Sequence, residues 1–169
     1  PRRRDPANCV TRKITVNIAK LSGTPQKTQA GGSLNAHLAS LNSKLAGLIG
    51  DRVDNSAHLS EIGVARAVAA NAPKKSALFV SSSLPIRLVD SYAPVTDASI
   101  FVASNRGASG IDGTIASAVG FARGCSRPTT LLIGDLAFLH DLNSLAMVRE
   151  AGVPFVIVLI NNNGGGIFH

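Results

Sequence analysis

The chain has 169 residues, of which 45% are hydrophobic and 16% charged, a composition that suits the buried core of a single α/β domain of ordinary size. Its net charge of +7 arises in residues 1–50, which hold eight Lys and Arg residues against one acidic residue, whereas residues 51–169 hold nine of each. No aromatic residue lies among these N-terminal basic residues, which argues against a nucleic-acid surface and favours a solvated linker.

Cysteine content and hydropathy argue against a disulfide-rich protein and against a membrane-spanning segment. Cys9 and Cys125 lie far apart without a CxxC pair, so the sequence indicates no disulfide framework and favours a reducing compartment. The longest apolar stretch, around residues 155–160, is too short to span a bilayer.

The N-terminal third predicts few elements. Alternating residues at 14–18 could form a strand. Leucines at helical spacing predict a packing or linking helix over 33–49, with Ser33 as its N-cap and Gly50 as its stop. The polar segment 51–60 is the best candidate for a domain boundary.

The remaining elements alternate between helix and strand. Helices are expected from residue 60 to before Pro73, from 84, over 114–124 and over the connector 136–152; strands are expected at 77–80, 100–103, 129–133 and 154–160. This order predicts the α/β class, with an open, mostly parallel sheet and helices on both faces.

Polar residues follow the last two of these strands. Asp135 comes directly after one strand, and Asn162 follows the next strand 27 positions later. Parallel strands place their carboxyl ends at one edge of the sheet, where α/β proteins bind ligands. Either residue alone is more simply explained as a turn or cap residue. Together with the glycines at 164–166, they predict a Mg²⁺ site that holds a diphosphate.

The same residues resemble a known family. Gly134-Asp135, a spacer and Asn161-Asn162 are similar to the cofactor-binding pattern of thiamine-diphosphate-dependent enzymes. Leu136 stands where most of these enzymes have a second glycine. The synthases of 2-succinyl-5-enolpyruvyl-6-hydroxy-3-cyclohexene-1-carboxylate in menaquinone and phylloquinone biosynthesis share this departure, and the blocks 78–87, 104–113, 141–143 and 161–168 resemble that branch.

The resemblance covers about residues 58–169 and implies a domain organisation. Residues 1–57 would be the tail of a middle domain and a linker, and 58–169 the first part of the C-terminal, diphosphate-binding domain. We therefore expect a fragment of a longer enzyme, with the thiamine-diphosphate-binding fold incomplete at its C-terminus.

The resemblance also implies roles for ten residues. Asp135, Asn162 and the carbonyl of Gly164 would bind Mg²⁺. The implied cofactor contacts are Ile111, Gly134, Asp135, Asn162, Gly164, Ile167 and Phe168, with Ile111 beneath the bend of the cofactor. Ser83, Arg87 and Arg106 would bind the acidic substrates, since an arginine fork suits a carboxylate. Ser81 and Ser82 replace a Gly-Asn pair that is usual in the family.

The implied reaction is a carboligation by a transferase. Thiamine diphosphate would decarboxylate 2-oxoglutarate and add the succinyl-semialdehyde unit to isochorismate. The glutamate that activates the cofactor would come from the N-terminal domain of another subunit, so we expect a homodimer or tetramer and an inactive fragment. The location would be cytoplasmic in a bacterium and plastidial in a plant or alga.

Three alternatives remain at this stage. One is another thiamine enzyme, such as an acetolactate synthase or a 2-oxo-acid decarboxylase, against which Leu136 and the two arginines argue. The second is a non-catalytic cofactor-binding module, and the third is a basic nucleic-acid binder that uses residues 1–30.

Overall fold

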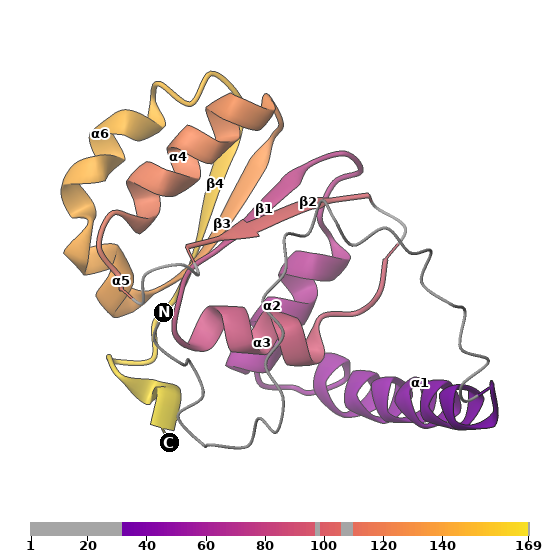
Figure 1. Cartoon of the computed structure of the whole chain (residues 1–169). Helices are drawn as coiled ribbons and strands as arrows, with labels where there is room; N and C mark the ends of the chain where they lie inside the picture. Colours follow the sequence, from indigo (N-terminus) through magenta and orange to yellow (C-terminus); the bar gives the residue numbers. More distant parts are fainter. Residues whose placement is uncertain (1–31, 97–98, 106–109, 169) are drawn as a thin grey trace, which may run out of the picture. The chain divides into compact units, whose positions relative to one another are not determined.

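The computed structural model of the chain describes residues 32–96, 99–105 and 110–168, and Figure 1 draws the elements in order. The strand predicted at 14–18 lies outside the described residues. Residues Ala39–His169 form one compact unit, which carries the sheet. In the described part of the chain, none of the helices has both the length and the apolar character that a membrane crossing requires.

A four-stranded, fully parallel sheet forms the centre of this unit, in the order β2-β1-β3-β4. The strands are β1 (Ala77–Val80), β2 (Phe101–Ser104), β3 (Thr129–Gly134) and β4 (Phe155–Ile160). The predicted α/β class and parallel open sheet are confirmed. The predicted domain boundary at residue 57 remains a prediction.

Helices precede and connect the strands (Figure 1). They are α1 (Gly32–Asp54), α2 (Glu61–Ala70), α3 (Leu84–Tyr92), α4 (Thr114–Cys125), α5 (Asp135–His140) and α6 (Leu145–Val148), with short 3₁₀ turns η2 (Leu142–Ser144) and η3 (Gly166–Phe168). Residues of α2 and α3 pack in one apolar cluster with the sheet, and residues of α4, α5 and α6 pack in another. Helices therefore cover both faces of the sheet.

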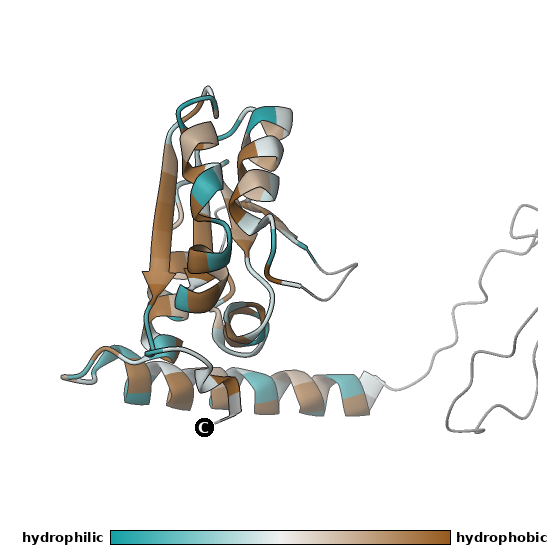
Figure 2. Ribbon diagram, turned by 90° about the vertical axis from the view of Figure 1, so that its left-hand side faces the viewer, coloured by the Kyte–Doolittle hydropathy of each residue, from teal (hydrophilic) through white to brown (hydrophobic). Residues whose placement is uncertain are grey.

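The two faces follow from the alternation of side chains along each strand. In β1, Leu78 and Val80 enter the cluster with α2 and α3, whereas Phe79 enters the cluster with α4. In β3, Leu132 lies on the first side and Leu131 on the second. Strands that are covered by helices on both faces need continuous apolar runs. Figure 2 agrees with this, since the strands are brown, or hydrophobic, whereas the helices carry both brown and teal residues.

The connector between β3 and β4 is not the single helix that its periodicity predicts. It breaks after α5 because Asp141 turns its side chain onto the start of α4. There the Oδ2 atom accepts the backbone N–H groups of Ile115 at 2.6 Å and Ala116 at 3.1 Å. The Oγ of Ser144 donates to the Oδ1 atom at 2.6 Å. A buried carboxylate thus satisfies donors at a helix N-terminus that have no partner within the helix.

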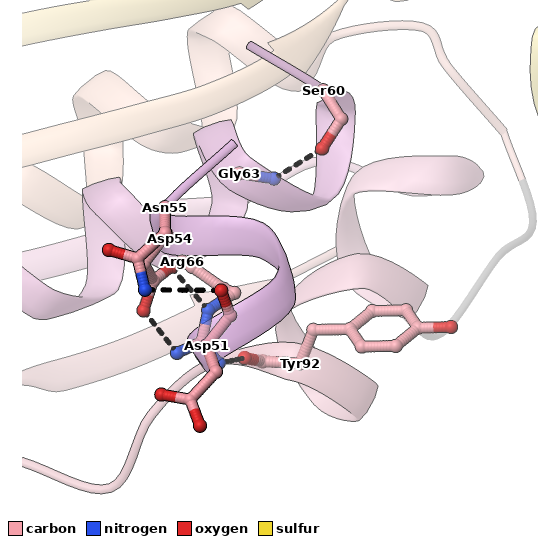
Figure 3. Close-up of polar contacts among 7 residues, drawn as sticks. All are labelled: Asp51, Asp54, Asn55, Ser60, Gly63, Arg66 and Tyr92. Carbon is pink, nitrogen blue, oxygen red and sulfur yellow. Dashed lines mark hydrogen bonds and ion pairs between the residues drawn. The ribbon is translucent and has the colours of Figure 1, made fainter. Parts of the chain in front are cut away.

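Gly50 does not end the first helix, which continues to Asp54. A Cβ at residue 50 would lie 3.2 Å from the Nη2 atom of Arg66, so glycine leaves room for that side chain. The Arg66 guanidinium is buried and binds both carboxylate oxygens of Asp54, at 2.8 and 2.7 Å (Figure 3). Its Nη1 atom donates to the carbonyl of Tyr92 at 2.8 Å. One arginine therefore ties together the ends of α1 and α3.

The Asp54–Arg66 pair predicts a pH-dependent contribution to stability. Hydrogen bonding to Arg66 holds the pKa of Asp54 below its ordinary value, although desolvation opposes the shift. A carboxyl group whose folded-state pKa is lowered stabilises the fold above its unfolded-state pKa, and this contribution disappears as the pH falls through the folded-state pKa. We expect Asp54→Asn to lower the melting temperature at neutral pH, and the difference from the unaltered chain to shrink as the pH falls below the ordinary carboxyl pKa of 3.8 and through the lowered folded-state pKa.

Asp51→Asn is the matched control, since Asp51 is an exposed residue of the same helix. Thermal unfolding followed by circular dichroism measures both variants across the pH range. A difference between Asp54→Asn and the unaltered chain that stays constant with pH would contradict the role of the ion pair.

Candidate functional site

The order of the strands predicts a ligand site at the edge of the sheet where the carboxyl ends of the strands lie. The chain passes from β1 outward to β2 and then returns to β3 on the other side of β1. Ligands of such sheets bind beyond the carboxyl ends of the strands at this reversal. The register of β3 and β4 pairs Gly134 with Ile160, so the segments that follow both strands begin at the same level.

Asp135 is the first residue of α5 and is half-buried. Its Oδ2 atom accepts the backbone N–H of Gly164 at 2.8 Å, and its Oδ1 atom accepts the N–H of Leu136 at 2.7 Å. The first of these bonds joins the segment after β3 to the loop after β4. The expected convergence of the two strand tips is therefore present in the structure.

The loop after β4 turns tightly through a run of left-handed residues. Asn163, Gly164 and Gly165 have φ angles of 61°, 84° and 72°. The Oδ1 atom of Asn161 accepts the N–H of Asn163 at 3.1 Å, which is an Asx turn. Glycine at 164 adopts this backbone without strain. A methyl of Leu136 lies 3.4 Å from where a Cβ at 164 would stand, so the leucine that departs from the family pattern lies directly against this glycine.

Asn162 has a defined amide orientation. Its Nδ2 atom donates to the Oε1 atom of Glu61, the first residue of α2, at 2.7 Å. Gly166 leaves room for this amide, because a Cβ at residue 166 would stand only 2.5 Å from the same nitrogen. The sequence alone does not point to Glu61 as part of the site. Glu61 is 101 residues away along the chain, and no local pattern marks the contact.

Most of the predicted site residues line one pocket of about 260 Å³ at this edge. Six of them share it: Ser83, Ile111, Gly134, Asp135, Asn162 and Ile167. Gly164 is connected to it through its bond to Asp135. The structure thus brings together residues from four separate segments of the chain.

The segment between β1 and α3 forms another wall of the pocket. Ser83 has φ 74° and ψ −133°, a conformation that residues other than glycine rarely adopt. The Oγ of Ser82 donates to the carbonyl of Asn105 at 3.2 Å, and so connects this wall to the end of β2. Strained backbone at the mouth of a pocket is typical of functional sites.

Of the two predicted substrate-binding arginines, the structure describes Arg87, which does not line the pocket. Arg87 is exposed, and its Nη1 atom donates to the carbonyl of Ser83 at 2.7 Å. That bond directs it to the first turn of its own helix. Arg106 and the side chain of Phe168 lie outside the described part of the chain.

The oxygen donors at this edge suit a hard cation. Mg²⁺ takes carboxylate, amide and carbonyl oxygens and retains water or phosphate ligands. The described residues contain no group of three or more His, Cys, Asp and Glu side chains that could hold a metal ion. A site with one carboxylate therefore fits Mg²⁺ with a phosphate ligand better than it fits a metal held by protein side chains alone.

A larger pocket of about 430 Å³ lies beside Asp54 and Arg66. This pocket is a poor candidate for the cofactor site, because its charged residue Arg66 is engaged by Asp54 and by the carbonyl of Tyr92. Arg66 thus has a structural role, and the pocket does not lie at the carboxyl ends of the strands.

Comparison with known families agrees with this geometry. Residues 88–169 match the model of the thiamine pyrophosphate enzyme C-terminal TPP-binding domain. The matched region includes α4, β3, β4 and the loop that carries Asn162 and Gly164.

Curated proteins named 2-succinyl-5-enolpyruvyl-6-hydroxy-3-cyclohexene-1-carboxylate synthase are similar to this chain. The protein of Rubrobacter xylanophilus is 47% identical over 100% of the chain and 30% of its own length. That of Shewanella halifaxensis is 48% identical over 86% of the chain and 25% of its own length. That of Chlorobium phaeovibrioides is 53% identical over 65% of the chain and 19% of its own length. The chain thus spans less than a third of the length of these relatives.

The tight contact at Gly166 predicts that a single methyl group disturbs the site. In Gly166→Ala the new Cβ would stand 2.5 Å from Nδ2 and 2.9 Å from Cγ of Asn162, so the amide or the backbone at residue 166 must shift, which disturbs the contact with Glu61. We expect a loss of about 1–3 kcal/mol in the free energy of unfolding, as for overpacking in general. Denaturant unfolding measures it, and a crystal structure of the variant shows the amide.

Gly120→Ala is the control, since a Cβ at residue 120 meets no atom within 4 Å. The assignment of Gly166 would be wrong if its alanine variant were as stable as Gly120→Ala and kept the contact between Asn162 and Glu61.

Proposed function

Because the chain belongs to the thiamine pyrophosphate enzymes, we propose that it is the diphosphate-binding part of a 2-succinyl-5-enolpyruvyl-6-hydroxy-3-cyclohexene-1-carboxylate synthase. The observation that carries the proposal is the 2.8 Å hydrogen bond from the N–H of Gly164 to Asp135 Oδ2. It brings the candidate carboxylate ligand beside the loop that supplies the other candidate oxygens. Relatives at 47% and 48% identity that bear this name support this branch of the family over the other thiamine enzymes.

Mg²⁺ would be held by the carboxylate of Asp135, the Oδ1 atom of Asn162 and the carbonyl of Gly164. Two observations support the fit. Asp135 and Asn162 line the same pocket. The Asn162 amide uses its nitrogen for Glu61, which leaves its oxygen as an acceptor.

Thiamine diphosphate, when bound, supplies the electron sink for the carbanion chemistry. The chain's own residues would bind and orient it. Its diphosphate would lie at the loop of Asn162 and Gly164, where glycines allow the backbone to approach closely. Ile111 and Ile167, which line the pocket, would contact its rings and exclude water.

The substrates would be 2-oxoglutarate and isochorismate. Ser83 lines the pocket, and Arg87 contacts the carbonyl of the same serine, so both stand near the place where an acidic substrate would meet the cofactor. Arg106 would bind a substrate carboxylate as well. The active enzyme would be a homodimer or tetramer in which another subunit supplies the activating glutamate.

The proposal predicts Mg²⁺-dependent binding of thiamine diphosphate that requires Asp135. Asp135→Asn removes the negative charge from the cation site. We expect the affinity for thiamine diphosphate in the presence of Mg²⁺ to fall at least about tenfold, since altering residues that merely support metal ligands already costs about 10–100-fold. Isothermal titration calorimetry of the chain measures it.

Asp90→Asn serves as the matched variant, since Asp90 is an exposed carboxylate on α3. Thiamine without its diphosphate is the control ligand, and chelation of Mg²⁺ should abolish the heat of binding. Equal affinity of the Asp135→Asn and Asp90→Asn variants would contradict the proposed cation site.

A further inference from the structure

The contact between Glu61 and Asn162 joins the candidate cation site to a helix that contributes no cation ligand. The two side chains meet at 2.7 Å, and both are half-buried. Glu61 opens α2, which is packed against the sheet through Ala65 in one cluster with Leu132 and Ile160. The position of the carboxylate is therefore set by the packing of a whole helix.

Glu61 determines which atom of the Asn162 amide faces it. An ionised carboxylate only accepts hydrogen bonds, so the amide must present Nδ2 and turn Oδ1 away. Hard cations bind the oxygen of an amide and are repelled by its NH₂ group. Without the Glu61 carboxylate, this hydrogen bond no longer favours one orientation of the Asn162 amide over the other. In the flipped orientation, Nδ2 instead of Oδ1 would face the cation.

We infer that Glu61 is a positioning residue that orients the Asn162 amide so that its Oδ1 atom binds the cation. This inference rests on the proposed function. Partners that hold a metal ligand in this way typically change metal affinity by about 10–100-fold when they are removed. Glu61 thus acts through Asn162 and needs no contact with the cation.

Two other roles for Glu61 must be separated from this one. A carboxylate in the first turn of a helix stabilises the helix through its dipole, which is a purely structural effect. A carboxylate near a cation site also attracts or directly binds the cation. The first role changes stability and leaves cation affinity unchanged; the second weakens binding whatever residue stands at 162.

The test measures the Mg²⁺ concentration that gives half-maximal binding of thiamine diphosphate, by calorimetry on the full 169-residue chain. In the unaltered background, we expect Glu61→Gln to raise this concentration about tenfold, because glutamine can also donate and permits the amide to turn. In an Asn162→Asp background, the two oxygens at 162 are equivalent and nothing remains to be oriented. There Glu61→Gln removes a repulsion between carboxylates, so the required Mg²⁺ concentration should stay the same or fall.

Ser60→Ala is the control for helix stability. The Ser60 hydroxyl caps the same helix end by accepting the N–H of Gly63 at 3.1 Å. This variant should lower the melting temperature and leave the Mg²⁺ dependence unchanged. A Glu61→Gln variant that behaves like Ser60→Ala would overturn the inference, and so would one that weakens Mg²⁺ binding equally in both backgrounds.

A second readout needs no cation. The side-chain amide protons of Asn162, observed by NMR, should show a downfield, carboxylate-bound resonance that Glu61→Gln shifts upfield. An unshifted resonance would overturn the inference on its own. Absence of Mg²⁺-dependent binding in the unaltered chain contradicts the proposed function, whereas normal binding with no effect of Glu61→Gln contradicts only the role of Glu61.

Discussion

The hydrogen bond from the N–H of Gly164 to Asp135 Oδ2 holds the candidate site together, because it joins the start of α5, directly after β3, to the loop after β4. Each of these two segments alone carries too few oxygen donors for a cation. Joined, they bring Asp135 and Asn162 to the same pocket. The pairing of Gly134 with Ile160 makes this bond possible, since it brings the two strands to the same level.

The surrounding structure supports this arrangement from three directions. Leu136 lies against Gly164, and Glu61 holds the amide of Asn162. Asp141 caps α4, whose first turn follows the segment that brings Ile111 to the pocket. Asp141, at the break in the connector, thus accepts backbone N–H groups, and Glu61, at the start of α2, accepts a side-chain amide. In the proposed site, both would fix orientation rather than supply ligands.

Much of the fold could be predicted because its signals are local. Apolar runs separated by helical segments gave the parallel sheet and its helices. Asp135 and Asn162 could be paired because parallel strands end at one edge. Glycine at 164 was expected for its close approach to a ligand, which stays a prediction; the structure shows a different reason for glycine there, a left-handed φ of 84°.

The remaining features depend on contacts between distant segments. Nothing near Glu61 in the sequence marks its bond to Asn162, and nothing near Asp141 marks its bond to the start of α4. Gly50 is a residue type that often ends a helix, yet here it stays helical and leaves room for the side chain of Arg66. In each case a tertiary contact decided the role of a residue whose local preference allowed several.

The most direct measurement is a crystal structure of the chain with thiamine diphosphate and Mn²⁺ in place of Mg²⁺, in which anomalous scattering locates the metal. We expect a single metal peak that touches the Asp135 carboxylate, Asn162 Oδ1 and the carbonyl of Gly164, at about the 2.1 Å typical of such cations. A metal and diphosphate bound elsewhere, with Asp135 and Asn162 left unliganded, would contradict it.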